Sequence, residues 1–148
     1  MVTDIERLIA LEEIKQLKAR YFRCMDTKDW DGFQAVFAPD ATMDTTQEAP
    51  GLDVVRGREN IRQFVEGSVG PVVTVHHGHM PEIEITSPTT ARGVWAMQDF
   101  LQMPEGSPLG MKSMTGYGHY TETYESVDGE WLIKTLVLTR LRRDVEMA

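Results

Sequence analysis

The order of two hydrophobic periodicities along the chain limits its fold more than any other sequence feature. Apolar residues near the N-terminus recur at three- and four-residue steps, which predicts an amphipathic helix from the capping-box residue Thr3 to about Met25. A shorter helical pattern begins at the N-cap candidate Asp29 and is ended by Pro39, and residues 58–66 show a third. The first half of the chain is therefore expected to hold three helices.

Beyond the third helical pattern the chain reads as strands. The strands predicted, including two short ones ahead of that helix, are residues 41–45, 52–55, 72–86, 90–103, 111–126 and 130–142. Asp128-Gly129 is a two-residue hairpin signal between the last two. Because helices come first and an antiparallel meander follows, the sequence predicts an α+β fold. The helices are expected to cover one face of a strongly bent sheet that encloses an apolar pocket.

The composition excludes several classes of partner. The chain of 148 residues has a formal net charge of −8, so neither nucleic acid nor an anionic membrane surface is an expected partner. No window approaches the ~20 consecutive apolar residues of a membrane span, and the N-terminus lacks the pattern of a signal peptide. The one cysteine, Cys24, cannot form an internal disulfide and is interpreted as a small buried helix residue. We therefore expect a single cytoplasmic domain over residues 1–148.

A carboxylate on an otherwise apolar strand face is the clearest functional signal. Residues of one parity in the 90–103 strand share a face, and that face is apolar except for Asp99. Its members are Trp95, Met97, Asp99, Leu101 and Met103. A buried carboxylate needs a partner, and the preceding strand supplies His76, His77 and His79. A histidine paired with this acid in an apolar setting suits acid–base chemistry.

Strand register selects one of these histidines. A hairpin loop that pairs Ile85 with Ala91 keeps the isoleucines of the first strand on the apolar side. One extra residue near positions 78–81, where Gly and Pro occur, would form a β-bulge and place His76 directly opposite Asp99. Without the bulge, either the register fails or the isoleucines turn outward.

Four segments of the chain carry a resemblance to a known family. They are IERLIALEEIKQLKARYFRCMDTKDWDGFQAVFAPDAT near the N-terminus, HHGHMPEIEI, ARGVWAM and the closing LVLTRLRRD. Together with the order of helices and strands, they resemble the SnoaL-like branch of the nuclear transport factor 2-like superfamily, over essentially the whole chain. The resemblance implies a cone-shaped α+β barrel, with three N-terminal helices on a bent mixed or antiparallel sheet and the pocket at its centre. Similar proteins include scytalone dehydratase, bile acid 7α-dehydratase, hexachlorocyclohexane dehydrochlorinase, polyketide cyclases and non-catalytic binding domains.

The resemblance also implies a set of catalytic residues. The dehydratase-like members use a Tyr and an Asp from the first helix, a His and an Asp from the sheet and, in some of them, an Arg from the last strand. Those positions match Tyr21, Asp26, His76, Asp99 and Arg140 of this sequence. Residues five apart lie about 140° apart around a helix, so Asp26 must sit at the helix end and turn inward to join Tyr21. By pattern alone, Tyr21 is equally consistent with core packing, and Asp26 with a surface position.

Four further residues are predicted to contact a substrate: Trp95, Met97, Tyr117 and His119. The first two share the face of Asp99, and the other two share a face with each other. The tight turn at Asp128-Gly129 would place Tyr117 opposite Arg140 on the last strand.

A metal site is the alternative interpretation of the histidines. His77 and His79 point the same way in a strand and have the spacing of a metal-ligand pair. The rest of a metal-binding motif is missing, and the acid–base set described above is complete without an ion. We therefore expect neither a metal nor a cofactor.

The outer face of the predicted sheet indicates self-association. It is more apolar than the face that a lone sheet normally exposes to water. Its apolar members are Val94, Phe100, Leu132, Leu136 and Leu138. A homo-oligomer is expected, with a trimer favoured by the resemblance and a dimer as the alternative.

The functional hypothesis is a cofactor-independent lyase of the dehydratase type that acts on a small hydrophobic molecule, such as a steroid, aromatic or polyketide-like compound. His76 would remove a proton, and Asp99 and Asp26 would orient its ring. Tyr21 and Arg140 would polarise a carbonyl or assist the leaving hydroxyl. The same groups would serve an isomerase or a cyclase, and a non-catalytic domain that binds small ligands is the alternative from another class.

Overall fold

Three helices precede most of the sheet in the computed structural model, which describes residues 1–148: α1 (Asp4–Asp26), α2 (Trp30–Ala35) and α3 (Arg58–Val69). The predicted capping box is present, because the Thr3 hydroxyl accepts from the Glu6 backbone N–H and the Glu6 carboxylate accepts from the Thr3 N–H. None of these helices is both long enough and apolar enough to cross a membrane. The prediction that Pro39 ends the second helix is wrong. Helix α2 ends at Ala35, and Pro39 lies inside the strand that follows.

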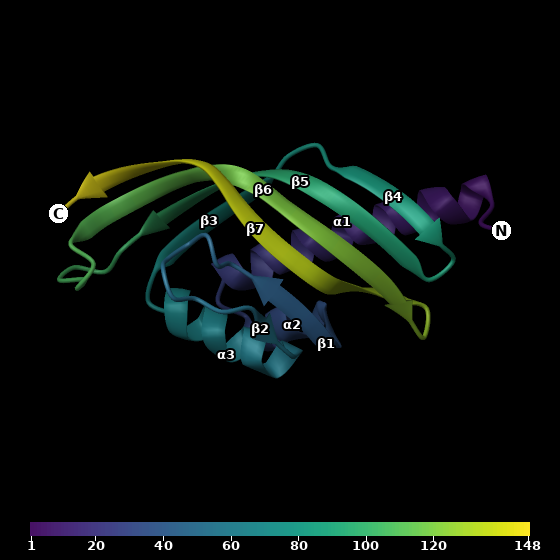
Figure 1. Ribbon diagram of the computed structural model, residues 1–148, viewed down its shortest axis with the longest axis horizontal. Helices are drawn as coiled ribbons and strands as arrows, with labels where there is room; N and C mark the ends of the chain where they lie inside the picture. The colour runs from purple at the N-terminus through teal and green to yellow at the C-terminus, as the bar shows by residue number, and fades with distance from the viewer.

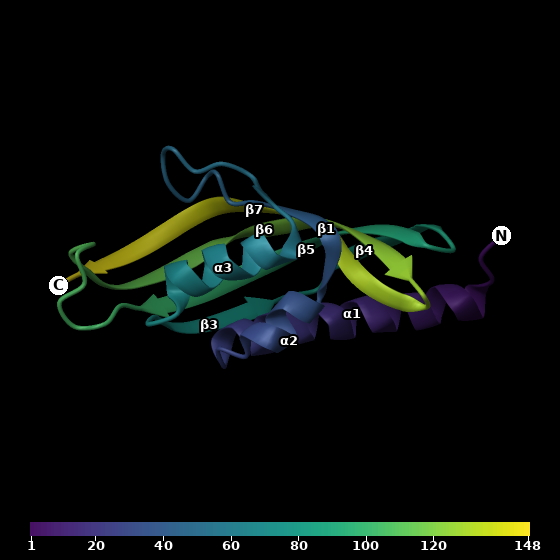
Figure 2. The same ribbon diagram turned by 90° about the horizontal axis from the view of Figure 1, so that it is seen from below.

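Seven strands form one mixed sheet. They are β1 (Phe37–Asp44), β2 (Val55–Arg56), β3 (Val73–Gly78), β4 (Glu82–Ser87), β5 (Thr90–Gln102), β6 (Met111–Val127) and β7 (Glu130–Met147). Their order is β2-β1-β7-β6-β5-β3, and β4 also pairs with β5. Only the contact between β1 and β7 is parallel. The sheet arches over the helices, which all lie on its concave side (Figures 1 and 2). This confirms the predicted α+β fold with three helices on a strongly bent sheet.

The core lies between the concave face of the sheet and helix α1, which packs against β3 and β7. The helix contributes the apolar stripe that its periodicity predicts, and the sheet contributes the inward-facing parity of its strands. Fully or nearly fully buried members of this cluster include Ile14, Leu17, Tyr21, Tyr120, Tyr124, Ile133 and Leu136. A cavity remains at one end of this core.

The register of the first hairpin agrees with the prediction. Ile85 pairs with Ala91, and His76 pairs with Asp99. One extra residue does lie on the first strand between the two ladders, and it divides the predicted 72–86 strand into β3 and β4. The bulge keeps both the isoleucines and His76 on the inward face.

The register of the last hairpin differs from the prediction. The turn at Asp128-Gly129 forms, but Arg140 pairs with Gly118 instead of Tyr117. Two irregularities in the ladder each add one residue to β7. At Gly118, the carbonyl of Thr139 approaches so closely that a β-carbon would collide with it, so only glycine permits the second irregularity. Turn length alone therefore does not predict pairing ten residues away.

These irregularities also correct the predicted outer face. Before the first irregularity, the odd-numbered residues Trp131 and Ile133 of β7 face inward. After it, the even-numbered residues Leu136, Leu138 and Arg140 face inward. Leu136 and Leu138 consequently face the core and are buried; Leu132, which precedes the shift, is also buried within the monomer, whereas Val94 and Phe100 are partly exposed. Most of the apolar surface invoked for self-association is therefore covered by this chain's own core, and the homo-oligomer stays a prediction.

Candidate active site

A cavity of about 240 Å³ lies between α1, α3 and the concave face of the sheet. Its wall is mostly apolar and comprises Met25, Met43, Leu52, Phe64, Val65, Val69, Leu101 and Leu138. Its polar lining includes Tyr21, Glu48, His76, Asp99, Tyr120 and Arg140. An apolar chamber with a few converging polar groups is the usual form of a small-molecule site.

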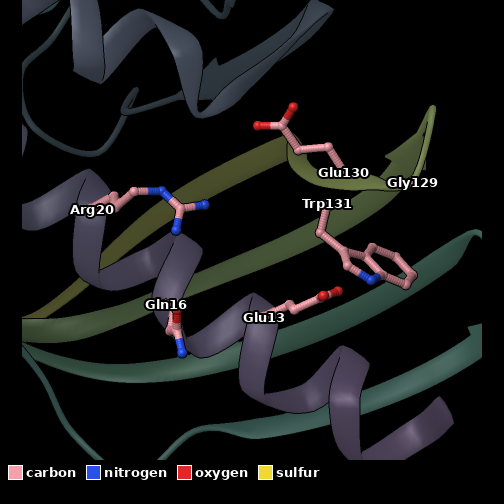
Figure 3. A pocket seen from close by; sticks show the side chains of 6 residues that line it. All are labelled: Glu13, Gln16, Arg20, Gly129, Glu130 and Trp131. Carbon is pink, nitrogen blue, oxygen red and sulfur yellow. The ribbon is translucent and has the colours of Figure 1, made fainter.

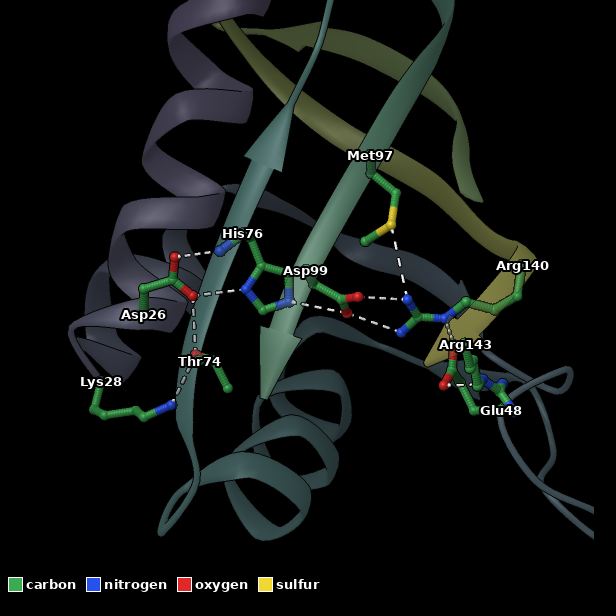
Figure 4. A network of polar contacts seen from close by, with 9 residues as sticks. All are labelled: Asp26, Lys28, Glu48, Thr74, His76, Met97, Asp99, Arg140 and Arg143. Carbon is green, nitrogen blue, oxygen red and sulfur yellow. Dashed lines mark hydrogen bonds and ion pairs between the residues drawn. The ribbon is translucent and has the colours of Figure 1, made fainter. Parts of the chain in front are cut away.

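His76 lies on β3 with its side chain only 6% exposed, and Asp26 binds both its backbone N–H and its ring. Asp26 Oδ2 accepts the His76 backbone N–H at 2.8 Å, and Asp26 Oδ1 lies 2.6 Å from His76 Nδ1 (Figure 4). Because a carboxylate accepts hydrogen bonds, the neutral ring carries its proton on Nδ1 and leaves the Nε2 lone pair free. Phe22 stacks on the ring at a centroid distance of 6.0 Å. Asp26, the last residue of α1, turns inward as expected.

Asp99 is held by Arg140 rather than by His76. Arg140 donates from Nη1 and Nη2 to the two carboxylate oxygens at 2.6 and 2.8 Å, and from Nε to Glu48 at 2.7 Å. His76 Nε2 is 3.8 Å from Asp99 Oδ2, which is beyond hydrogen-bond distance. Burial by itself lowers the pKa of Arg140, but Asp99 and Glu48 outweigh it and raise that pKa. The guanidinium therefore engages two carboxylates, which differs from the predicted role of polarising a substrate.

Two tyrosines face the cavity from opposite sides of the core. The rings of Tyr21 and Tyr120 meet edge to face with centroids 5.7 Å apart. Burial, the largest cause, raises the pKa of both phenols, so both hydroxyls remain protonated and able to donate. Lys18 Nζ lies 3.8 and 3.7 Å from the two ring centroids, and it is paired with Glu122 at 2.6 Å.

The sequence carried a signal for this ion pair that our interpretation did not use. Lys18 falls within the apolar stripe of α1, and Glu122 shares its inward parity with Tyr120 and Tyr124. Both are charged residues on apolar faces, which is the same signal that identified Asp99. Glu48, in contrast, comes from the irregular segment between β1 and β2, where no periodicity exists.

The four residues predicted to contact the substrate do not line the cavity. Trp95 lies in the core, where its Nε1 donates to the Tyr124 hydroxyl at 2.9 Å. Met97 faces inward, and its sulfur contacts Arg140. Tyr117 and His119 lie on the opposite face of β6 from Tyr120, because alternate residues of a strand point to opposite sides. Of the catalytic set implied by the resemblance, however, Tyr21, His76, Asp99 and Arg140 line the cavity, and Asp26 binds His76.

Other parts of the surface offer no comparable chemistry. A second depression, lined by Glu13, Gln16, Arg20, Gly129, Glu130 and Trp131, has only one apolar residue and no histidine (Figure 3). No cluster of three or more His, Cys, Asp or Glu side chains is arranged to hold a metal ion. His77 and His79 are exposed, with ring centroids 6.4 Å apart.

Several proteins of known structure have a similar fold. A candidate scytalone dehydratase from Novosphingobium aromaticivorans has a TM-score of 0.84 at 22% identity, over 99% of this chain and 93% of that one. The hexachlorocyclohexane dehydrochlorinase LinA-type3 from Novosphingobium barchaimii has a TM-score of 0.82 at 21% identity, over 97% and 94%.

Sequence comparison leads to the same group of proteins. FGR4 of Gibberella zeae, a probable cyclase, is 26% identical over 136 residues, which cover 86% of this chain and 89% of that one. The model of the SnoaL-like domain family matches residues 6–137. That match spans most of the chain, so the chain belongs to the SnoaL-like domain family.

Proposed function

We propose that this protein is an enzyme that begins its reaction by abstracting a proton from a small hydrophobic molecule, with His76 as the general base. One observation carries the proposal. His76 binds Asp26 through Nδ1, at 2.6 Å, while its ring borders a largely apolar cavity. This arrangement fixes the tautomer and leaves Nε2 as the basic atom, which is what a general base requires.

The proposed reaction is the loss of water, as in a dehydratase-type lyase that needs no cofactor. His76 Nε2 takes a proton from a carbon next to a carbonyl or an activated ring, and Asp26 stabilises the imidazolium that forms. The Tyr21 and Tyr120 hydroxyls donate to the oxygen on which negative charge develops. Asp99, which is fixed by Arg140, lies 3.8 Å from Nε2. A small movement of the protonated His76 ring toward Asp99 would let this carboxylate stabilise its charge. The proton held by His76 then passes to the departing hydroxyl.

The size of the cavity narrows the substrate class. Drug-sized ligands occupy pockets of about 300–1,000 Å³, and this cavity measures about 240 Å³. A compact aromatic or polyketide-like compound of one or two rings therefore suits it better than a steroid. The apolar wall favours a molecule with few charges.

An isomerase or cyclase is the second candidate, since both reactions also begin with proton abstraction. The probable cyclase among the sequence relatives favours it, and the scytalone dehydratase and dehydrochlorinase among the structural relatives favour an elimination. A binding domain without chemistry would tolerate a filled cavity or an outward-facing histidine. The open cavity and the inward orientation of His76 support an enzyme instead.

Turnover assays on base variants test the proposal. Thermal-shift screening of phenols, cyclic ketones and hydroxylated polyketide-like compounds would first supply a ligand that is also turned over. His76→Ala should then lower kcat by about 10²–10⁴-fold, and Asp26→Asn should lower it by releasing the ring. His77→Ala is the matched control, because His77 is exposed on the same strand. Loss of activity in His77→Ala with activity retained in His76→Ala would refute the assignment.

A further inference from the structure

Asp26 is the end of a longer chain of hydrogen bonds that the proposed reaction does not use. Its Oδ1, which faces His76 Nδ1, also accepts from the Thr74 hydroxyl at 2.9 Å. Thr74 in turn accepts from Lys28 Nζ at 3.0 Å (Figure 4). A hydroxyl has one hydrogen, so Thr74 must direct it at Asp26 while its lone pair receives the ammonium. Thr74, the central residue of this bridge, is only 3% exposed, and Asp26 and Lys28 on either side of it are half-buried.

Lys28 makes this contact from an unfavourable backbone conformation. Lys28 follows the C-cap of α1 and has a φ of 62°, in the left-handed region. Glycine, or sometimes asparagine, is the usual residue at such a position, because a side chain there is disfavoured. The turn folds Lys28 back so that its ammonium reaches Thr74, two residues before His76 on β3. Burial lowers the pKa of this lysine, and only the nearby Asp26 opposes that effect.

The electrostatic surroundings of His76 indicate what the bridge does. Asp26 lies against Nδ1, and Asp99 lies 3.8 Å from Nε2. Two uncompensated carboxylates would favour the imidazolium, which cannot abstract a proton. Asp99 is neutralised directly by Arg140. Asp26 has no lysine or arginine bound to it directly, and Thr74 links it by hydrogen bonds to the ammonium of Lys28.

We propose that Lys28 and Thr74 are positioning residues, which together neutralise the outer side of Asp26 and so keep His76 unprotonated and correctly oriented as a base. The inference rests on the proposed function, because an unprotonated and correctly oriented His76 matters only if His76 acts as the base. The titratable groups that face His76 or its partners are Tyr21, Asp26 and Lys28 from α1 and its end, Glu48 from the β1–β2 segment, Asp99 from β5, Tyr120 from β6 and Arg140 from β7.

The test uses the ligand-free protein, so it does not depend on turnover. NMR of the imidazole rings follows the protonation of each of the four histidines with pH, and His76→Ala identifies the His76 signal. In Lys28→Met and in Thr74→Val, the midpoint for His76 should move to higher pH, because Asp26 loses its counter-charge or its link to it. Thr74→Ser and Lys28→Arg keep the hydroxyl and the charge, and should behave as the wild type does.

Two further variants separate this role from folding. Lys28→Gly should move the His76 midpoint as Lys28→Met does while the protein melts no earlier, since glycine adopts a positive φ without strain. Lys112→Met, which removes an exposed lysine far from the site, should change neither property. An unchanged His76 midpoint in both Lys28→Met and Thr74→Val would overturn the inference and leave the proposed function standing. A shifted midpoint in a protein that turns over no substrate would uphold the inference and count against the proposed function.

Discussion

The buried pair of Lys18 and Glu122 allows a prediction that depends on no substrate. Neither side chain has any solvent exposure, and Nζ is 2.6 Å from Oε2. Lys18→Met removes the cation and leaves the Glu122 carboxylate in the core with the Tyr124 hydroxyl as its remaining donor. Removing one partner of a buried pair typically costs about 3–5 kcal/mol, and the full figure is expected because no water can reach the orphaned charge.

The double variant Lys18→Met/Glu122→Gln should be far more stable than the single one. It has no buried charge, and the Gln oxygen can still accept from Tyr124, so its free energy of unfolding should lie well above that of Lys18→Met, below the wild type only by the cost of the unpaired Gln amide N–H groups. Urea denaturation of the wild type, both single variants and the double variant measures the coupling. Lys112→Met, at an exposed pair, is the control and should have no measurable effect. The reasoning is wrong if Lys18→Met is as stable as the wild type, or if the double variant is as unstable as Lys18→Met.

Three further predictions follow from the same structure. Burial, partly opposed by Glu122, lowers the pKa of Lys18 from 10.5 to about 8. Between these pH values the unfolded chain binds a proton that the folded one has lost, so the stability of the wild type relative to the double variant should rise across this window; a flat or falling difference in urea titrations contradicts this. Gly116→Ala would place a β-carbon against the Arg140 guanidinium and the Asp99 carboxylate, so thermal melts should show a loss of about 1–3 kcal/mol and assays a loss of activity, whereas wild-type behaviour would argue against a tight site. Light scattering should report a mass above that of the monomer at micromolar concentration, and a monomer mass refutes the predicted homo-oligomer.

Short-range patterns predicted much of the scaffold. The capping box at Thr3 formed because it involves only the first turn of one helix. Asp128-Gly129 formed its turn because its φ values are positive at both residues, which this dipeptide tolerates. The pairing of His76 with Asp99 was also predictable, since a buried face permits only one register once the bulge is included.

The details of the site depended on longer-range geometry. Arg140 was expected opposite Tyr117, but one added residue in β7 between the turn and Arg140 moved it opposite Gly118, and its guanidinium binds Asp99. Asp99 and Asp26 were both expected to bind His76, but only Asp26, at the helix end, lies within hydrogen-bond distance of its ring. Glu48 holds Arg140 from an irregular segment that has no periodicity to read.

The sequence by itself determined the order of elements, the face of each strand and the identity of the acid that needed a partner. These properties follow from the local periodicity of the sequence, because the direction of each side chain is set by its position in a helix or strand. Only the tertiary structure decided which partner each charge takes, because partners such as Lys18 and Glu122 are 104 residues apart in the chain and meet at 2.6 Å. In a low-dielectric core a charge must pair with whatever opposite charge the packing brings within reach, and that choice is made by the curvature and irregularities of the sheet.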